Sequence, residues 1–467
     1  MRLANVLGFD PDNRSWVMDD SRQPLVTLPP LEGVLHIHET ALNEAADDFG
    51  HLRHLRPIAV LEPRSNEDVV SIVRFARAHG IKIGVRGRGS SVYGQSQVEG
   101  GILINMASLN TQSIFGANCV EVSAGLTWAQ VLEETLPRGM RPPVLTHNVE
   151  LSVGGTLSVG GMDGGSYRHG GQVDNVLELL VVTGEGVLET CSPAQLPELF
   201  DAVLAGLGQC GIILRATLRS IPAHTHARVF ELLYPDLPTM LDDERLLVND
   251  GRIDRISGYV FPSAGGRWSY YVQADHNCMP SEALDRDFMP SGLHHLRGFE
   301  RIYTAPYYDF VANNPRQAAL KADGRIKLPH PWLDVFVPDS VANQYLAETF
   351  GSLTPADIGV DFPISFFFIN TAVCKRPLLQ LPAEESACLF NLMTTITKPE
   401  TTKHMVDQNR QFFDRARELG GKHLPVSAMP LTKQDWREHF GSAWEQFSQA
   451  KRRFDPDNIL SPGLGIF

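Results

Sequence analysis

The sequence lacks the signatures of several protein classes. No apolar run approaches the roughly 18 residues that a membrane-spanning helix needs. The six cysteines are scattered without CxxC spacing, so free thiols in a reducing compartment fit better than a disulfide framework. No HExxH motif, nucleophile elbow or GxxxxGKS/T phosphate loop is evident. Metal-dependent and acyl-transfer chemistry therefore have little support, and no metal site is predicted.

Positive charge is also scarce. The 41 lysines and arginines stand against 54 aspartates and glutamates, which gives a formal net charge of -13. This balance argues against nucleic acid or an anionic membrane as the main partner. The N-terminal stretch is too short and too soon acidic for a signal peptide, so we expect a cytoplasmic location. With 467 residues, 43% of them hydrophobic, the chain is long enough for two domains and at least one large core.

Glycine, by contrast, is concentrated in two places. The first is the loop Gly84-Val-Arg-Gly-Arg-Gly-Ser-Ser-Val-Tyr-Gly-Gln95, which lies between two predicted strands. Gly87 and Gly89 leave backbone N–H groups open to an anion, and Arg86 and Arg88 add positive charge at the same place. A pyrophosphate would fit this loop, and an ordinary glycine-rich turn is the alternative.

The second place is Val153-Gly-Gly-Thr-Leu-Ser-Val-Gly-Gly-Met-Asp-Gly-Gly-Ser-Tyr-Arg-His-Gly-Gly171, with eight glycines in 19 residues. Such a stretch cannot build a side-chain core of its own, so its backbone is expected to pack against something flat or extended. Two loops that can bind anions, well separated in the sequence, suggest one long cofactor lying between them.

Periodicity and capping residues predict the elements around these loops. Ser65 and Thr127 are expected to cap helices, each with a capping-box partner three residues on. Further helices are expected from Pro193 and over Trp436 to Phe447, and a hairpin turn at 183–186. Strand candidates are 57–63, 81–86, 101–106, 212–218, 229–233, 268–273, 333–337 and 360–369. Residues up to about 45 predict an arm packed on the body.

The two glycine loops resemble the flavin-binding segments of cytokinin dehydrogenases, which belong to the vanillyl-alcohol-oxidase superfamily of FAD enzymes. The likeness begins at Arg86-Gly-Arg-Gly-Ser-Ser-Val-Tyr-Gly-Gln95 and covers roughly residues 50 to 467. It continues through Val153-Gly-Gly-Thr-Leu-Ser158, Tyr167-Arg-His-Gly170, Asn175-Val-Leu-Glu-Leu179, Val182-Thr-Gly184, Thr190-Cys-Ser-Pro193, Gly206-Leu-Gly-Gln-Cys-Gly-Ile212, His330-Pro-Trp-Leu333 and Phe454-Asp-Pro-Asp-Asn-Ile-Leu-Ser-Pro-Gly463.

This resemblance implies an α+β fold, a two-domain flavoprotein of the vanillyl-alcohol-oxidase type. The FAD-binding domain, 1–224 and 426–467, would be discontinuous around a substrate or cap domain at 225–425. The implied cofactor is FAD. The residues expected to bind it are Val85, Arg86, Gly87, Arg88, Gly89, Ser90, Ser91, Gln95, Ser152, Gly154, Gly155, Ser158, Met162, Gly211, Ile212, Ile213 and Ser461.

Ser90 marks a first departure from the family pattern. Cytokinin dehydrogenases attach FAD covalently through a histidine that aligns with this position. Serine cannot form the 8α-histidyl bond, and no cysteine near the second glycine cluster could form another link. We therefore expect FAD to be dissociable and the flavin to be a weaker oxidant.

His147 marks a second departure. The aspartate that contacts the oxidised amine in cytokinin dehydrogenases lies six residues before the Val-Gly-Gly, and His147 stands there. An imidazole can act as a base near neutral pH; a histidine packed beside the flavin with another task is the alternative. Glu150 and Asp163 are further candidates, although aspartate beside glycines usually makes a turn. Loss of the aspartate argues against cytokinin itself as the substrate.

Aromatic residues of the middle region could line a pocket for a planar, mostly apolar ligand, about one in three of them, with the rest in the core. Phe366 and Phe368 should share one strand face, opposite Phe367. The other members of this set are Tyr303, Tyr307, Tyr308, Phe310 and Trp332.

The sequence thus predicts an FAD-dependent oxidoreductase that oxidises a C–N or C–O bond of a small, fairly apolar substrate. The hydride would pass to flavin N5, with oxygen or a quinone as the electron acceptor. A homodimer and a role in specialised metabolism are further expectations. Two alternatives stay open: cyclisation, dehydration or reduction at the same site, and a ligand-binding relative without turnover.

Overall fold

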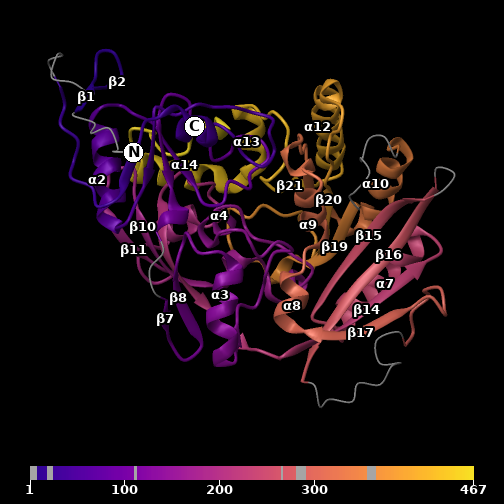
Figure 1. Cartoon of the computed structure of the whole chain (residues 1–467). Helices are drawn as coiled ribbons and strands as arrows, with labels where there is room; N and C mark the ends of the chain where they lie inside the picture. Colours follow the sequence, from indigo (N-terminus) through magenta and orange to yellow (C-terminus); the bar gives the residue numbers. More distant parts are fainter. Residues whose placement is uncertain (1–7, 18–24, 110–112, 264–266, 280–290, 355–363) are drawn as a thin grey trace.

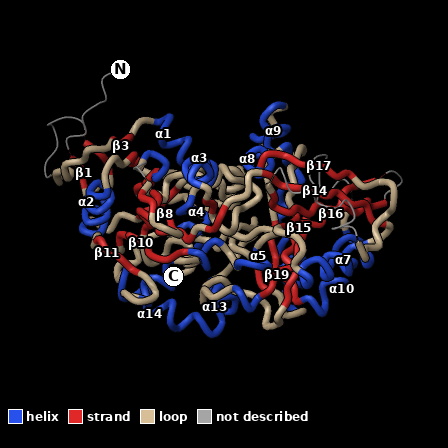
Figure 2. Tube along the Cα trace, turned by 90° about the horizontal axis from the view of Figure 1, so that it is seen from below, coloured by secondary structure: helices blue, strands red, loops and turns tan. Residues whose placement is uncertain are grey.

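The computed structural model describes residues 8–17, 25–109, 113–263, 267–279, 291–354 and 364–467. Figure 1 shows two lobes side by side. One lobe combines the N-terminal half of the chain with the last helices, and the other is built from the middle of the chain. The lobes meet where α5 (Ser166–His169) lies against β19 (Ile364–Asn370), near the centre of Figure 2.

The first glycine loop follows a strand of a four-stranded sheet. Its strands are β3 (Val34–His36), β4 (Ala59–Glu62), β5 (Ile83–Arg86) and β6 (Ile102–Asn105), in the order β3-β4-β6-β5. The last three are parallel, and β3 is antiparallel to β4. Helix α2 (Asn66–Ala78) connects β4 to β5. Ser65 and Asp68 form its expected capping box, and its apolar stripe is buried with Ile81 and Ile83.

A second, antiparallel sheet supports the second glycine cluster. It consists of β7 (Ile114–Phe115), β8 (Cys119–Ser123), β10 (Val176–Val182), β11 (Leu188–Cys191) and β12 (Ile212–Arg219), in the order β11-β10-β12-β8-β7. Helix α3 (Trp128–Thr135) begins with the expected capping box of Thr127. The helix predicted from Pro193 is corrected: α6 (Pro197–Val203) begins at Pro197, because Leu196 has a φ of 48° and Ser192 pairs with Gln195.

The middle of the chain forms an eight-stranded antiparallel sheet in the order β17-β14-β16-β15-β19-β20-β18-β21. Besides β19, its strands are β14 (His226–Tyr234), β15 (Arg255–Ser263), β16 (Arg267–Cys278), β17 (Arg301–Pro306), β18 (Leu333–Pro338), β20 (Ser386–Leu392) and β21 (Lys422–His423). These strands confirm the candidates of this region, apart from residues 360–363, which lie outside the described residues.

Helices cover one face of this cap sheet, and the other face turns toward the first lobe. The covering helices are α7 (Leu237–Asp250), α10 (Asp339–Ser352) and α12 (Thr402–Glu418), visible on the right of Figure 1. Phe366 and Phe368 pack beneath these helices, whereas Phe367 belongs to the core shared with the first lobe. The predicted opposite orientation of Phe367 is therefore confirmed. Two short helices, α8 (Tyr307–Ala312) and α9 (Pro315–Ala322), join β17 to β18.

The C-terminal segment returns to the first lobe. The single helix predicted over Trp436 to Phe447 is corrected to two, α13 (Lys433–Phe440) and α14 (Trp444–Phe454). Gly441, with a φ of 48°, interrupts the helical path between them. Beyond α14 the chain runs beside β5: the Ile83 N–H donates to the Ile459 carbonyl (2.8 Å), and the Ser461 N–H donates to the Ile83 carbonyl (2.8 Å).

The N-terminal arm packs on the body, as the sequence predicts. Its described part forms the pair β1 (Gly8–Asp10) and β2 (Ser15–Val17), strand β3 and helix α1 (Glu39–Ala45). Phe9 is buried in the same cluster as α2. No hydrophobic periodicity predicts these elements, because each is too short to repeat a pattern.

Candidate functional site

The first glycine loop is shaped by two glycines and one buried carboxylate. Gly89 and Gly94 have φ values of 68° and 76°, a conformation that other residues rarely adopt. Asp48 accepts hydrogen bonds from the Gly94 N–H (2.7 Å) and from the Ser91 hydroxyl (3.0 Å). The loop therefore adopts one defined conformation around the Asp48 carboxylate, which comes from the segment that follows α1.

The two arginines of this loop have different surroundings. The Arg86 guanidinium donates to the carbonyls of Glu44 (3.1 Å) and Asp47 (3.0 Å), and burial lowers its pKa. Arg86 thus ties the loop to the arm. Arg88 and Ser90 are exposed on the loop and remain accessible to an approaching ligand.

The C-terminal segment closes the same loop. The Gln95 side chain donates to the Ser427 carbonyl (3.3 Å). Ser461, hydrogen-bonded to Ile83 of β5, accepts at its carbonyl from the Gln209 side chain (2.8 Å). Four stretches of the sequence therefore meet here, and three of them contain predicted cofactor residues.

The two glycine clusters touch one another at Ser152. A Cβ placed on Gly87 would lie 2.0 Å from Ser152 Oγ, and one on Gly155 would lie 2.8 Å from the same atom. Apart from Ser152, neither Cβ position has a neighbouring atom within 4 Å. Both glycines therefore leave open backbone beside a hydroxyl, and this cradle fits the phosphates of a long cofactor better than it fits any side chain.

The second cluster continues from this cradle into the sheet. Helix α4 (Val153–Leu157) packs so closely on β8 that a Cβ on Gly154 would lie 2.8 Å from that of Ala124. The Gly154 N–H donates to the Ala124 carbonyl (2.8 Å), and the Ala124 N–H donates to the Leu214 carbonyl (2.9 Å). Ser158 donates to the Gly154 carbonyl (2.7 Å). The remaining predicted cofactor residues nearby, Met162, Gly211, Ile212 and Ile213, are buried.

His147 lies on the segment that leads into Ser152, and its ring faces the cap. Nε2 is 3.1 Å from the Ser257 hydroxyl on β15, and the ring centre is 6.1 Å from that of Phe367. The residue is exposed by its surface area, although protein packs densely around its ring. Burial, reinforced by Arg255 and Arg316, lowers its pKa to about 3. The imidazole is therefore uncharged at neutral pH.

A row of polar side chains crosses the cap sheet on the face that His147 meets. Tyr259 of β15 is paired with Ser365 of β19, Ser365 with Asn391 of β20, and Asn391 with Asp334 of β18. Asn391 Nδ2 is buried, with no hydrogen-bond partner among the described residues. Burial raises the pKa of Asp334 to about 7, against the opposing effect of Arg316. Such a row on a buried face suits a ligand that has both donors and acceptors.

The two other predicted catalytic carboxylates lie elsewhere. Glu150 is exposed. Burial raises the pKa of the Tyr308 hydroxyl, and the negative charge of Glu150 adds to this rise. Asp163 is buried and accepts from the Gly165 N–H (2.7 Å), the turn geometry expected of aspartate beside glycines. Burial raises the Asp163 pKa to about 6, partly offset by Arg255, and both residues line a cavity of about 30 Å³. That volume suits water rather than a substrate.

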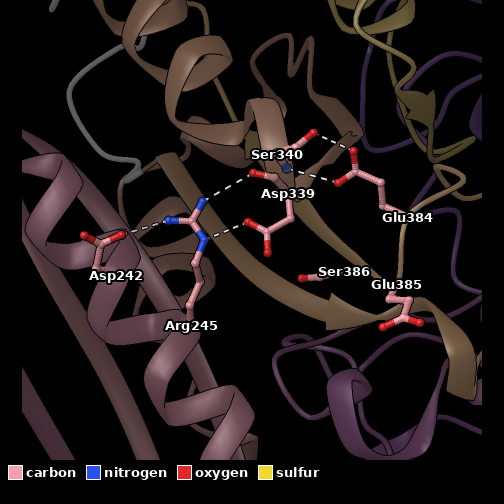
Figure 3. A pocket seen from close by; sticks show the side chains of 7 residues that line it. All are labelled: Asp242, Arg245, Asp339, Ser340, Glu384, Glu385 and Ser386. Atoms are coloured by element: carbon pink, nitrogen blue, oxygen red, sulfur yellow. Dashed lines mark hydrogen bonds and ion pairs between the residues drawn. The ribbon is translucent and has the colours of Figure 1, made fainter.

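A wider surface hollow of about 540 Å³ lies at α7 and α10 (Figure 3). Arg245 pairs with Asp242 and with Asp339, and Glu384 accepts from the Ser340 N–H (3.0 Å), so acidic side chains outnumber the single arginine. It is lined by residues of the covering helices and of the strand end at Ser386, away from the glycine loops. We assign it no role in cofactor binding.

In the part of the chain that the structure describes, no three histidine, cysteine, aspartate or glutamate side chains gather to hold a metal ion. Over the same residues, no helix combines the length and the apolar character required to cross a bilayer.

Comparisons with known proteins decide the family. Residues 57–192 match the family model of the FAD binding domain, and residues 267–467 match the model described as cytokinin dehydrogenase 1, FAD and cytokinin binding. The chain is 33% identical over 487 residues to cytokinin dehydrogenase 9 of Oryza sativa subsp. japonica, covering 94% of this chain and 91% of that protein. The chain belongs to the cytokinin dehydrogenase family.

Two further relatives match this member of the cytokinin dehydrogenase family over most of its length. It is 35% identical over 434 residues to the uncharacterized oxidoreductase ORF5 in the fasciation locus of Rhodococcoides fascians, covering 93% of this chain and 99% of that protein. It is 31% identical over 495 residues to cytokinin dehydrogenase 1 of Arabidopsis thaliana, covering 96% and 84%. The protein is thus an FAD-dependent oxidoreductase, and the glycine cradle at Ser152 fits that cofactor.

Several residues of this site were not predicted from the sequence. No sequence pattern around Asp48 predicts its role, because its partners on the first glycine loop lie more than 40 residues away. Asp334 and Ser365 did give one: each is a polar residue within an otherwise apolar strand, on the face opposite its apolar neighbours.

Proposed function

We propose that this protein oxidises a C–N bond of a small, fairly apolar amine, and that compounds of the cytokinin type are the first to test. Oxidation of a C–O bond is the second candidate. When bound, FAD supplies the hydride acceptor at N5. The observation that carries the proposal is the contact of His147 with Ser257 on the polar face of the cap sheet, five residues before Ser152 in the chain. The names of the plant relatives support an amine as substrate.

His147 would act on the proton of the substrate N–H. If Nε2 donates its hydrogen to Ser257, Nδ1 carries the lone pair and can accept that proton. Ser257 is also hydrogen-bonded to Tyr259, so the positive charge on His147 would be spread over a short polar chain. A pKa near 3 makes the imidazole a poor resting base. We infer that it first orients the substrate by accepting a hydrogen bond and takes the proton as the hydride leaves.

We also propose that FAD is held without a covalent bond. Ser90 has only a hydroxyl at the position of the family's attachment histidine. The two nearest histidines, in the segment that follows α1, face Asp47. His51 Nδ1 lies 2.7 Å and His54 Nδ1 lies 3.5 Å from the Asp47 carboxylate. Acid precipitation checks this point, because dissociable flavin stays in the supernatant whereas attached flavin stays in the pellet.

The proposed domain boundaries divide the chain between cofactor binding and substrate binding. Residues 1–224 and 426–467 would form the FAD-binding domain, discontinuous around a substrate domain at 225–425. The backbone bonds between β5 and Ile459 support this division. Oxygen or a quinone is the proposed electron acceptor.

Product analysis tests the proposed reaction. Isopentenyladenine, an N6-substituted adenine, is incubated with the protein and a quinone. Loss of a hydride and a proton converts its C–N bond to an imine, which water hydrolyses to adenine and an aldehyde. The matched control is the N6-methylated compound, which lacks the N–H. Adenine from the first compound alone supports the proposal. Oxidation of the corresponding allylic alcohol alone would favour C–O chemistry, and binding without any product would favour a ligand-binding protein.

A further inference from the structure

A buried carboxylate, Asp48, lies between the N-terminal arm and the flavin loop. Only 5% of its surface is exposed. Its Oδ2 accepts from the Gly94 N–H (2.7 Å) and the Ser91 hydroxyl (3.0 Å), and its Oδ1 accepts from the Gly50 N–H (3.1 Å). Each carboxylate oxygen therefore serves a backbone donor, and no proton is needed on either oxygen.

The residues after Asp48 continue along the loop. The Phe49 N–H donates to the Gly89 carbonyl (2.9 Å), and the Gly50 N–H also donates to the Ser91 carbonyl (3.1 Å). A Cβ on Gly50 would lie 1.9 Å from the Val92 carbonyl oxygen, so only glycine allows this close approach. The residues directly after Asp48 are thus joined to the flavin loop by two backbone bonds.

The same segment contacts the cap on its other side. The Phe49 ring stacks on His330, with ring centres 4.2 Å apart and planes 4° from parallel. The His330 N–H donates to the Gly50 carbonyl (2.9 Å). His51 Nε2 lies 3.1 Å from the Ile326 carbonyl oxygen. Segment 47–51 therefore touches the flavin loop and the cap at once.

We propose that Asp48 is a positioning residue that fixes the flavin loop for FAD, and that segment 47–51 transmits the order of this loop to the cap at 326–332. Gly89 and Gly94 hold the loop in left-handed conformations, and the Asp48 carboxylate keeps it there by binding Gly94 and Ser91. The cofactor selects the ordered loop, so whatever disorders the loop weakens cofactor binding. The proposal rests on FAD binding and on its proposed reversibility, but not on the proposed substrate.

The variant Asp48→Asn tests the first half. The amide oxygen can take the place of Oδ2, which accepts from Gly94 and Ser91, but the amide NH₂ then faces the Gly50 N–H, donor against donor. Gly50 keeps its bond to the Ser91 carbonyl, so the loss of one bond and this repulsion are expected to weaken FAD binding about tenfold. The matched control is Asp457→Asn, whose carboxylate pairs with Arg77 on the surface. Its dissociation constant, measured by quenching of flavin fluorescence on adding apoprotein, should stay within about twofold of the unmodified protein.

The pH dependence of FAD binding separates positioning from a general loss of fold. Burial raises the pKa of Asp48 to about 6, and the protonated form accepts fewer bonds from the loop. FAD affinity of the unmodified protein should therefore fall as the pH drops below about 6, whereas that of Asp48→Asn should lack this step. The other charged groups around Asp48 are Asp47, Glu44, Arg86 and His51. They are the same in both proteins, so the difference between the two profiles reports Asp48 alone.

Limited trypsin digestion tests the link to the cap. Lys327 is exposed and follows Ile326, whose carbonyl meets His51. Saturating FAD should slow cleavage after Lys327 in the unmodified protein and in Asp457→Asn, and much less in Asp48→Asn. Ser91→Ala, which removes one hydroxyl, should weaken FAD binding in the same direction if Asp48→Asn does not fold.

Three results would overturn the proposal: equal FAD affinity of Asp48→Asn and Asp457→Asn, identical pH profiles of Asp48→Asn and unmodified protein, or a rate of Lys327 cleavage in the unmodified protein that does not change with FAD. Flavin that stays in the acid pellet would instead refute reversible binding. The same variants would then be compared by the fraction of chains that carry flavin, with the loss again expected in Asp48→Asn alone.

Discussion

The turn that brings the chain back to β5 depends on a buried ion pair. Lys451 and Asp455 lie 2.6 Å apart, with side chains 4% and 0% exposed. Asp455 also accepts from the N–H groups of Ile459 (3.0 Å) and Leu460 (2.9 Å), and Lys451 donates to the Gln209 carbonyl (2.9 Å). These bonds set the segment that hydrogen-bonds to β5 directly before the flavin loop.

The substitution Asp455→Asn should strongly lower the stability of this arrangement. It keeps the shape of the side chain but leaves the Lys451 ammonium buried without a countercharge. Breaking one partner of a buried pair costs about 3–5 kcal/mol. Because the amide can keep one of the backbone bonds, we take the lower end, ~3 kcal/mol. At about 2–4 °C per kcal/mol for a large domain, the unfolding temperature should fall by ~6–12 °C.

Thermal unfolding followed by circular dichroism measures this loss. The matched control is Asp457→Asn, two residues away, whose carboxylate pairs with Arg77 while 51% exposed. A surface pair of this kind contributes ~0–1 kcal/mol, so its unfolding temperature should change little. If Asp455→Asn unfolds no earlier than Asp457→Asn, the buried pair does not secure the returning segment and the reasoning is wrong.

Three further predictions concern the cofactor cradle, the imidazole and pH. Gly87→Ala places a Cβ 2.0 Å from Ser152 Oγ and should yield protein without the visible flavin spectrum. The control Gly351→Ala adds a Cβ with no neighbour within 4 Å and should keep the yellow colour of bound flavin. His147→Asn should lower kcat about a hundredfold, since acid–base catalysis contributes about 10²–10⁴-fold, and should leave the FAD dissociation constant unchanged; equal kcat would exclude His147 from the reaction. Burial lowers the pKa of His147 to about 3 and that of His330 to about 4, so the unfolded chain binds more protons below about pH 6.5. The stability contribution of these neutral rings is complete above that pH and is lost as the pH falls toward 4. The urea midpoint should therefore fall more between pH 7 and pH 5 in the unmodified protein than in a variant with both His147→Asn and His330→Asn, which keeps the buried carboxylates whose raised pKa values act in the opposite direction.

The sequence was most informative where structure depends on neighbours in the chain. The capping boxes at Ser65 and Thr127 use partners three residues away, and the alternation at Phe366 to Phe368 fixes strand faces. The sequence also predicted that the glycine loops bind a cofactor, because their composition excludes a side-chain core. Such signals are local, and folding preserves them.

Contacts between distant segments were beyond the sequence. The flavin loop and His330 both contact segment 47–51, but they lie far from it in the sequence. The break at Gly441 was missed because the apolar spacing of Trp436, Phe440 and Trp444 fits one continuous helix, although a positive φ ends it. The polar row at Asp334 gave a signal within its strand, but its registration with Asn391 appears only in the assembled sheet.

Anaerobic mixing of the purified protein with isopentenyladenine tests the central claim most directly. Without an acceptor, hydride transfer from the substrate must remain on the bound FAD, so the account predicts that the visible flavin absorbance bleaches and returns when a quinone is added. Flavin that stays oxidised with isopentenyladenine, with its allylic alcohol and with related amines, in protein that contains its full complement of FAD, would contradict it.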